Sequence, residues 1–593
     1  MNTLREVLEV FDNPEKKKFD YHEISSELSL LPEEQLELFE VKAESLAMQF
    51  QDNTGKDHWG TFLGPLTTWK RKDTGEEILC PDKRLIIIDH IDYWERRSVE
   101  TCNPLMKMRY LGLVFDFKNA VTGTKPNYHS VILPYIDALL NVVKGDYPVH
   151  ELSCCYILDR ALQLASQIRN NQLFEDAQQI LWDFDHKYGI DEKAGIWGEH
   201  FRLMLKYRSR YGKYEDILVQ ENEERFDRFE KQCLSDYNNA DKFVYLLGIE
   251  SDLLCDYYRV NSDKVKVKNL LDRELNVISR SFPKKGGMWA QAMLQTMQSK
   301  YRKSQLYKEA NRLYVDIQNF GNEALEELHG VEISVPIDND LIDRCLNVLM
   351  TGKKEEVLVK YILSNIPIQK KEKQLQKEEA EQSPLLDFVK TITYDSSGFP
   401  INNIGGGVDP VQQKYMYNMC QHIHYQSIIV RLEVEKLIEN DILNLDVVLN
   451  LYKDSPLILD GQREILRRGM QAYFENDYLV ACHLLIPLFE SVIRNIVAIC
   501  GGEILQPDVD SRNGNRYISL EGLLNSEELK SILTEDIIIY FRNLFTDHCG
   551  WNLRNLLSHG LMGNTSFNST TADRVIHAFL IISQLRVIEQ ANA

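Results

Sequence analysis

Hydrophobic positions recur at intervals of three and four residues over most of the chain, which is the period of an amphipathic α-helix. The pattern is clearest from residue 409 onward. There it predicts helices near 410–439, 441–453, 461–475, 477–500, 519–532, 535–546, 551–559 and 571–591. The last four or five of these suffice for an antiparallel bundle around one core. We therefore predict a mostly α fold that ends in a helical bundle.

Three short segments in the middle of the chain resemble one another: Gln172–Ala177, Gly212–Ile217 and Gln305–Ala310. Each places a large side chain after a polar turn and then opens an amphipathic helix. Their spacing is close to one and two steps of a period of roughly 40 to 50 residues, which predicts an irregular, tetratricopeptide-like α-solenoid. Helix-start chemistry that recurs without a true repeat explains the same segments equally well.

A chain of 593 residues exceeds what one core usually serves, so two or three domains are expected. Near the N-terminus, the β-branched run Arg84–Asp89 predicts either a strand or a buried helical turn. Further on, Gln369–Gln382 has almost no apolar side chain, which indicates a solvated helix or a linker, and Thr391–Pro400 indicates a small β-turn feature. The predicted regions are a mixed, mainly helical part at 1–125, helical repeats at 126–368, a charged linker with the β feature at 369–408, and the bundle at 409–593.

The composition limits the kinds of binding partner and the cellular compartment that we expect for this chain. The net charge of -21 argues against a basic surface that binds duplex nucleic acid tightly without sequence preference. After residue 460 every basic side chain except Lys530 is an Arg, which suits bidentate contacts to phosphate and equally suits ion pairs at an interface. The 11 Cys include no CxxC pair, so reduced thiols are expected, with neither a disulfide framework nor a zinc ribbon.

Nothing in the pattern predicts membrane insertion. The first 20 residues are charged and lack the apolar run of a secretory signal. The longest apolar stretch, Val480–Cys500, contains His483, Glu490, Arg494 and Asn495, which is typical of a buried or interfacial helix. We therefore expect a cytoplasmic protein with no membrane partner.

Candidate chemistry gathers in the segment Trp551–Gly560. On a helical wheel its leucines fall on one arc, and Arg554, Asn555, Ser558 and His559 fall on the opposite arc. Gly560 is suited to end the helix, which places His559 in the last turn, where the helix dipole favours imidazolium. An Arg and a His within two turns can stabilise charge on a phosphodiester and transfer a proton.

This segment resembles the motif of a known family. The order of a long helix through Ala481–Asn495, a loop, the Asn552–Gly560 segment and a closing helix resembles the HEPN (higher eukaryotes and prokaryotes nucleotide-binding) superfamily. It is most similar to the branch that includes the endoplasmic reticulum membrane-associated RNA degradation protein. The resemblance spans residues 410–590 and leaves the region before residue 365 unexplained.

The resemblance implies a function. HEPN ribonucleases use an Arg and a His separated by four to six residues, usually in a cleft shared by two protomers, and they cleave RNA without metal through attack by the 2′-hydroxyl. It implies that Arg554 holds the scissile phosphate and that His559 transfers the proton. Asn555 would orient the imidazole or contact the phosphate. Glu490, Arg494 and Ser558 would support the site. No metal or cofactor is expected, and the implied partners are RNA and a second copy of the chain.

The resemblance also implies a setting, which is a toxin or an antiviral-defence effector. The acidic repeats would then bind a protein partner or restrain the nuclease, so deleting residues 1–365 is expected to raise activity.

Other interpretations of the same residues stay open. Arg554 would pair with Glu490 or another carboxylate of the bundle in a structural ion pair, and Glu490 would equally pair with Arg494 one turn away. His559 would cap the helix, and Asn555 would form a hydrogen bond across a dimer interface. The chain would then be a non-catalytic HEPN-like scaffold for dimerisation and for binding protein or nucleotide.

Two groups of metal-type residues complete the candidates. Cys420–His424 has no second cluster at ligand spacing and is interpreted as helix surface and core. His548 and Cys549 would need to meet Cys482 and His483 in space, and we expect no metal there.

Overall fold

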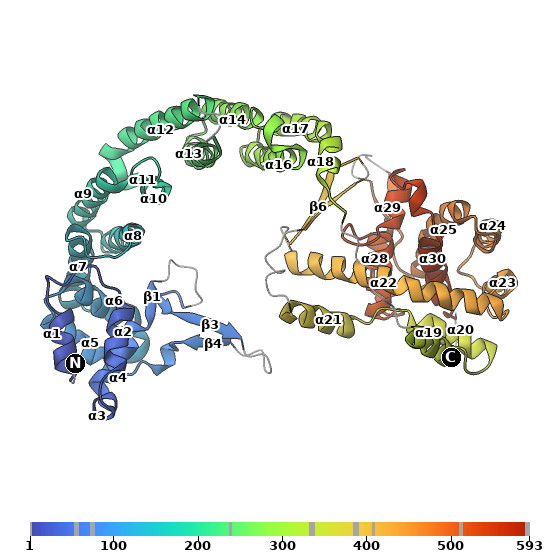
Figure 1. The fold of residues 1–593 in the computed structure, drawn as a ribbon, viewed down its shortest axis with the longest axis horizontal. Helices are drawn as coiled ribbons and strands as arrows, with labels where there is room; N and C mark the ends of the chain where they lie inside the picture. The colour runs from blue at the N-terminus through green and yellow to red at the C-terminus, as the bar shows by residue number, and fades with distance from the viewer. Residues whose placement is uncertain are drawn as a thin grey trace. The chain divides into compact units, whose positions relative to one another are not determined.

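The computed structural model describes residues 3–52, 59–70, 77–235, 240–330, 339–382, 391–395, 397–405, 409–508 and 514–586. It is mostly α-helical, as the periodicity predicted (Figure 1). The chain forms two compact units: Met1–Lys285 with Met293–Leu313, and Gly286–Ala292 with Tyr314–Ala593. The divisions thus fall just before α16 (Gly287–Lys303), within α16 and within α17 (Tyr307–Asn319). The sequence pattern suggested boundaries after residues 125, 368 and 408 instead.

The first unit begins with six helices and two small antiparallel sheets. The helices are α1 (Leu4–Phe11), α2 (Tyr21–Ser29), α3 (Glu33–Leu36), α4 (Phe39–Met48), α5 (Ile88–Glu100) and α6 (Pro104–Thr122). The sheets pair β1 (Phe50–Asp52) with β2 (Leu63–Pro65), and β3 (Thr67–Lys70) with β4 (Glu77–Cys80). The β-branched run after Arg84 is not a strand, because Lys83–Leu85 forms a 3-10 turn and Ile88 begins α5.

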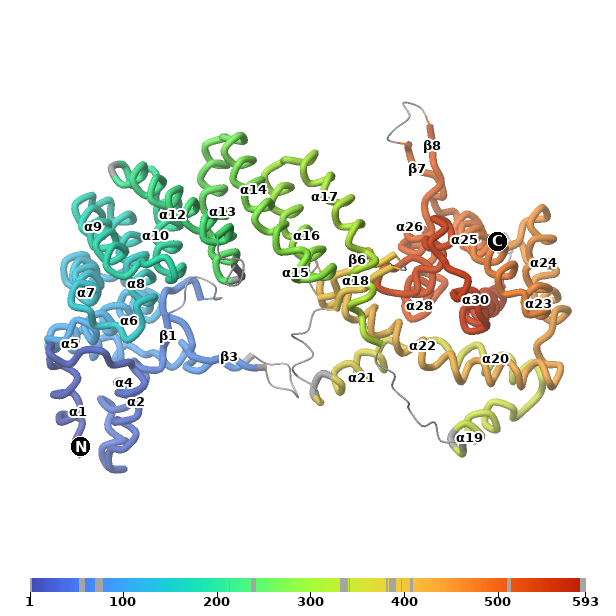
Figure 2. Tube along the Cα trace, turned by 45° about the horizontal axis from the view of Figure 1, so that its top comes forward, coloured from blue at the N-terminus to red at the C-terminus, as the bar shows by residue number. Residues whose placement is uncertain are grey.

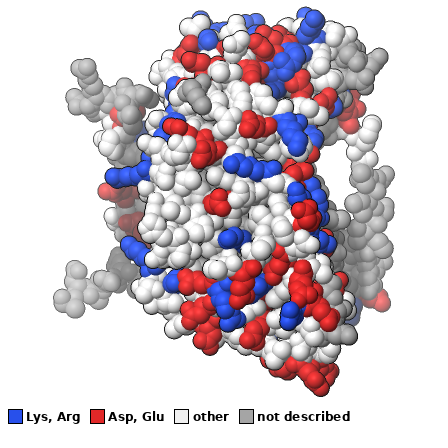
Figure 3. All heavy atoms as spheres, turned by 90° about the vertical axis from the view of Figure 1, so that its left-hand side faces the viewer, with Lys and Arg blue, Asp and Glu red and all other residues white. Residues whose placement is uncertain are grey.

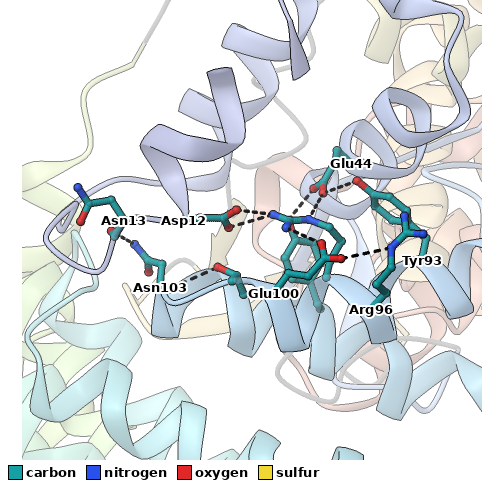
Figure 4. A network of polar contacts seen from close by, with 10 residues as sticks. Asp12, Asn13, Glu44, Tyr93, Arg96, Glu100 and Asn103 are labelled. Atoms are coloured by element: carbon teal, nitrogen blue, oxygen red, sulfur yellow. Dashed lines mark hydrogen bonds and ion pairs between the residues drawn. The ribbon is translucent and has the colours of Figure 1, made fainter. Parts of the chain in front are cut away.

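A buried carboxylate holds these first helices together (Figure 4). Glu44 is fully buried and accepts hydrogen bonds from Tyr93 Oη at 2.8 Å, Tyr110 Oη at 2.7 Å and Arg97 Nε at 3.0 Å. Arg97 also reaches Asp12 at 2.7 Å. Burial raises the pKa of the Glu44 carboxyl, opposed mainly by the positive charge of Arg97. This buried network of hydrogen bonds and ion pairs joins α4, α5 and α6 to the end of α1.

The rest of the first unit is a succession of helices. They are α7 (Leu133–Lys144), α8 (Glu151–Gln167), α9 (Asn171–Tyr188), α10 (Ala194–Lys206), α11 (Arg208–Tyr211), α12 (Glu215–Ser235), α13 (Ala240–Val260), α14 (Lys264–Ser279) and α15 (Phe282–Lys285), followed by part of α16 and α17 (Tyr307–Asn319). From α7 to α14 most helices pack on a neighbour in sequence, as α8 does on α7 and α9, and α13 on α12 and α14; α10 packs mainly on α8 and α13. Figure 2 shows these helices side by side. The three similar segments lie at the starts of α9, α12 and α17, so the helix starts expected there are confirmed.

Charge on the first unit is mixed. On the face drawn in Figure 3, Lys and Arg side chains alternate with Asp and Glu side chains, and no continuous basic surface covers it. This agrees with the net charge of -21 and disfavours broad phosphate binding on that face.

The second unit is built around a helical bundle. Its earlier elements are α18 (Gly321–Glu327), α19 (Asn339–Leu349), α20 (Lys354–Ser364), α21 (Gln369–Gln382) and the hairpin of β5 (Thr391–Tyr394) and β6 (Pro400–Ile404). The bundle proper follows as α22 (Pro410–Glu439), α23 (Leu445–Leu451), α24 (Arg463–Phe474), α25 (Tyr478–Ile499), α26 (Leu520–Leu524), α27 (Glu527–Lys530), α28 (Glu535–Phe545), α29 (Leu553–Ser558) and α30 (Ser569–Ile582), with the hairpin β7 (Leu505–Pro507) and β8 (Asn515–Tyr517) after α25. In the core, α25 packs against α24 and α30, and α22 packs against α28 and α30.

The charged segment expected as a solvated helix or linker is α21, and it docks on α22. His422 of α22 lies between Glu372 Oε2, 2.5 Å from its Nδ1, and Glu379 Oε1, 3.2 Å from its Nε2. Hydrogen bonds from the ring to the two carboxylates, that to Glu372 foremost, raise the pKa of this imidazole. The Thr391–Pro400 feature is confirmed as the start of the β5–β6 hairpin.

Helix ends in the bundle differ from the pattern where caps intervene. The segment 519–532 is two short helices, because Asn525 ends α26 and the Ser526 hydroxyl accepts from Leu529 N to begin α27. The closing helix ends at Ile582. The helix expected at 551–559 is shorter, since Asn552 has a left-handed backbone with φ of 53°.

The longest apolar helix is buried in the bundle. Among the described residues, α25 alone is long and apolar enough to cross a bilayer by length and composition. Its inner side chains, including Leu485, Phe489 and Val492, are buried in the core. Gly469 of α24 allows a close approach, because a Cβ there would lie 2.6 Å from Leu485 Cδ2. The packing is that of a core helix, as expected for Val480–Cys500.

Candidate active site

The motif helix α29 is positioned by the turn that precedes it. The backbone oxygen of Asn543, in α28, accepts from Trp551 N at 2.8 Å and from Asn552 N at 3.4 Å. Gly550 lies so close to the backbone of α28 that a Cβ on it would be 2.3 Å from Asn543 O. Leu553 is buried, and α29 packs on α25 and α28. The chain around the motif is therefore fixed from both sides.

Arg554 is held by a carboxylate from α25. Its Nε donates to Glu490 Oε2 at 2.7 Å, its Nη2 lies 3.5 Å from Glu490 Oε1, and its Nη1 donates to Asn555 Oδ1 at 3.0 Å. The Arg554 side chain is 27% exposed and that of Glu490 is 13% exposed. These contacts use three of the five N–H groups of the guanidinium. The other two form no hydrogen bond with any described residue and can bind another anion.

Glu490 bridges two guanidinium groups. Its Oε1 accepts from Arg494 Nη2 at 2.7 Å, one turn along α25, while Arg554 occupies the other side. The Arg494 guanidinium also lies over the ring of Tyr517, 5.0 Å from its centroid, and its Nη2 is 3.4 Å from Ile518 O. Both ion pairs considered from the sequence occur together, and they tie α29, α25 and the segment after β8 into one polar patch.

Asn555 orients Arg554 and the chain around it. Its Nδ2 donates to Asn552 Oδ1 at 2.8 Å and to Thr546 O at 3.2 Å, while its Oδ1 accepts from Arg554. Within the described residues its amide has no hydrogen bond to the imidazole of His559. The Asn555 amide therefore lies against the Arg554 guanidinium, and its expected contact with a phosphate stays a prediction.

His559 and Ser558 lie at the exposed end of the helix. His559 is the C-cap residue, its backbone N donates to Asn555 O at 3.1 Å, and Gly560 follows with φ of 68°. Both side chains are exposed, and the imidazole has no hydrogen bond or ion pair with any described residue. The motif thus presents a restrained guanidinium and an unengaged imidazole on one short helix.

No family model, curated protein or solved structure matches this chain. The resemblance to HEPN proteins accordingly rests on the motif residues and the helical bundle.

A second polar cluster, in α30, was missed in the sequence. Asp573, Arg574 and His577 are fully buried. Asp573 Oδ1 accepts from Tyr473 Oη at 2.6 Å, and Arg574 Nε donates to Ser427 Oγ at 2.9 Å. Burial lowers the pKa of His577 to about 3, with Arg574 adding to the effect.

The signal for this cluster was available in the sequence. Three ionisable side chains at positions i, i+1 and i+4 of an apolar helix require partners in the core. Because all three side chains are buried, the cluster joins helices through hydrogen bonds, and no substrate can reach it.

Metal-type residues gather at the turn before α29. The ligand atoms of Asp547, His548 and Cys549 lie within 4.8 Å of one another. The turn faces α22, where Cys420 O accepts from Trp551 Nε1 at 3.5 Å. Burial raises the pKa of the Cys549 thiol to about 11 and that of Cys420 to about 12, with Asp547 adding to both. Cys482 is buried in α25, and His483 stacks on Phe567, so neither belongs to this group of ligand atoms.

Proposed function

We propose that the chain is an endoribonuclease that cleaves RNA by attack of the substrate's own 2′-hydroxyl, with Arg554 and His559 as the catalytic pair. The observation that carries the proposal is that one short segment presents a positioned guanidinium, on α29, and an exposed imidazole, on the residue that caps α29, with no hydrogen bond to any described residue. Arg554 stabilises the negative charge that develops on the phosphate, and His559 transfers a proton. The chemistry requires no Mg²⁺ at the reacting phosphate.

The supporting residues would act through Arg554. Asn555 and Glu490 restrain the guanidinium, Arg494 balances the charge of Glu490, and Ser558 lies beside His559 on the exposed surface. Restraint of this kind lowers the entropy lost when the phosphate binds. As in the family that it resembles, the chain would act as a homodimer whose two motifs share one cleft.

The wider setting is part of the same proposal. The chain would work in the cytoplasm as a toxin or defence effector, and the first unit would act as an α-solenoid that binds a protein partner. Most helices from α7 to α14 pack on a neighbour in sequence, which supports the solenoid. Removal of residues 1–365 is no clean test of restraint, because Arg574 and His577 bond to Asn365 O and Ile362 O in the core of the second unit.

RNA cleavage by the full chain in Mg²⁺-free buffer tests the catalytic pair. We expect cleavage by the unmodified chain and a loss of at least about 100-fold in Arg554→Ala and in His559→Ala. His129→Ala, an exposed imidazole in the first unit, is the matched control and retains full activity. Equal cleavage by both motif variants, or none by the unmodified chain on any RNA tried, would overturn the assignment.

A second function follows from the Arg554–Glu490 ion pair. If this pair is purely structural, the bundle is a non-catalytic scaffold that dimerises and binds protein or nucleotide. The scaffold predicts that Arg554→Ala lowers bundle stability while His559→Ala changes neither stability nor dimerisation. Thermal unfolding and sedimentation of the two variants, read beside the cleavage assay, separate the two functions.

A further inference from the structure

The turn Asp547–Gly550 brings together a carboxylate, an imidazole and a thiol at the entrance to the motif helix. Their ligand atoms lie within 4.8 Å of one another. Zinc bonds of roughly 2.0 to 2.3 Å place tetrahedral ligand atoms about 3.3 to 3.8 Å apart. Side-chain rotations that move the three ligand atoms by about 1 Å would therefore bring them to zinc-binding distances. The three residue types are common zinc ligands.

The backbone of the turn is fixed, which leaves the side chains to meet an ion. Asp547 O accepts from Gly550 N at 3.0 Å, and Asp547 Oδ1 accepts from Cys549 N at 2.8 Å. The side-chain amide of Asn402 donates to His548 O at 2.7 Å and holds the middle of the turn. The Asp547 oxygen bound to the backbone orients the carboxylate, and its other oxygen is available to a metal.

The thiol and the imidazole have no competing hydrogen bond among the described residues. Cys549 is only 4% exposed, yet its thiol forms no hydrogen bond with any described residue. The His548 ring is exposed and likewise has no partner among the described residues. The buried thiol would give the ion a ligand that is shielded from solvent, and the exposed imidazole would let the ion enter from solvent.

We propose that Asp547, His548 and Cys549 bind one zinc ion, with the fourth position left to water or another donor. The thiol releases its proton to solvent on binding, because the thiolate is the ligand. The ion would have a structural role. Leu553 begins α29 four residues after Cys549, so zinc would stabilise the turn that sets the position of α29 and of its second residue, Arg554. The inference does not rest on ribonuclease activity, and the ion takes no part in the cleavage chemistry.

Metal titration of the full chain, without an affinity tag, tests the site. After EDTA treatment and its removal, the chain is titrated with Zn²⁺ by calorimetry and with Co²⁺ by absorption. We expect about one equivalent of each ion to bind, and the Co²⁺ form to show a thiolate-to-cobalt charge-transfer band.

Two variants test the ligands by different routes. Cys549→Ser is expected to abolish the charge-transfer band, and His548→Ala to lower zinc affinity at least tenfold. Because His548 is exposed, its removal leaves the fold intact, which far-ultraviolet circular dichroism verifies. Cys500→Ser, an exposed thiol at the end of α25, is the control and keeps both the band and the affinity.

The proposal is overturned by either of two results. One is the absence of stoichiometric zinc binding by the unmodified chain. The other is retention of the full zinc affinity and of the cobalt band in both ligand variants, since the ion would then lie elsewhere. Cleavage assays are not part of this test, so its outcome is independent of the ribonuclease proposal.

Discussion

Replacing Glu490 by Gln removes the charge that Arg494 and Arg554 share while it keeps the length and shape of the side chain. In the folded bundle the two carboxylate oxygens accept at 2.7 Å from both guanidinium groups. The amide in the variant offers an oxygen to one Arg and turns an N–H group toward the other. The helix α29 therefore loses most of its charged attachment to α25.

The expected cost is about 2 kcal/mol. A hydrogen bond to a charged group contributes about 1.5 to 3 kcal/mol when well buried, and two such bonds weaken here. Exposures of 13% for Glu490 and 27% for Arg554 reduce each contribution through solvent screening. At about 1.4 kcal/mol per factor of ten, opening of α29 becomes roughly 30-fold more frequent.

Hydrogen exchange measured by mass spectrometry on peptides covering residues 552–561 detects this opening. The amides of Leu556 and His559, which donate to Asn552 O and Asn555 O, are the reporters and should exchange about 30-fold faster. Glu464→Gln is the control, because the Glu464–Arg467 pair is 64% and 46% exposed and should change exchange by less than about twofold. Exchange in Glu490→Gln within twofold of the unmodified chain would refute the idea that this charge holds α29.

Two further predictions concern burial and close packing. Glu250 is fully buried, and burial raises its pKa from 4.5 to about 8, so the folded chain keeps a proton that the unfolded chain releases between these values. Its contribution to stability is present below about pH 4.5 and is lost as the pH rises through about 8. The thermal stability of the first unit should therefore fall between about pH 4.5 and 8, and fall less in Glu250→Gln. Equal slopes of stability against pH in the two proteins would contradict the raised pKa. Gly550→Ala should lower the free energy of unfolding by about 2 to 3 kcal/mol, because the new Cβ would lie 2.3 Å from Asn543 O. Gly563→Ala is the control: a Cβ there has no atom within 4 Å, so its stability in the same thermal assay should be nearly unchanged. Similar stability of the two Gly variants would show that the turn yields to the extra atom.

Local patterns were sufficient for much of the bundle. The apolar period and the caps placed α22, α24, α25 and α28 within a few residues of their observed ends, since each helix depends on its own sequence. The periodicity failed where a cap splits a segment, as at Ser526, or where a backbone angle delays a helix, as at Asn552. It also missed the docking of α21, because His422 lies far from Glu372 in sequence.

The candidate site shows the same division. The sequence by itself determined that Arg554, Asn555, Ser558 and His559 share one short amphipathic helix, because residue spacing decides which side chains meet on a helix. Only the tertiary structure decided that Glu490 joins Arg554 to Arg494, that His559 stays exposed, that Asp573 and Arg574 are sealed in the core, and that Asn402 holds the turn carrying His548 and Cys549. These contacts join residues that are far apart in the chain. Whether an Arg is paired or an imidazole is free depends on how the helices pack, which spacing along one helix does not encode.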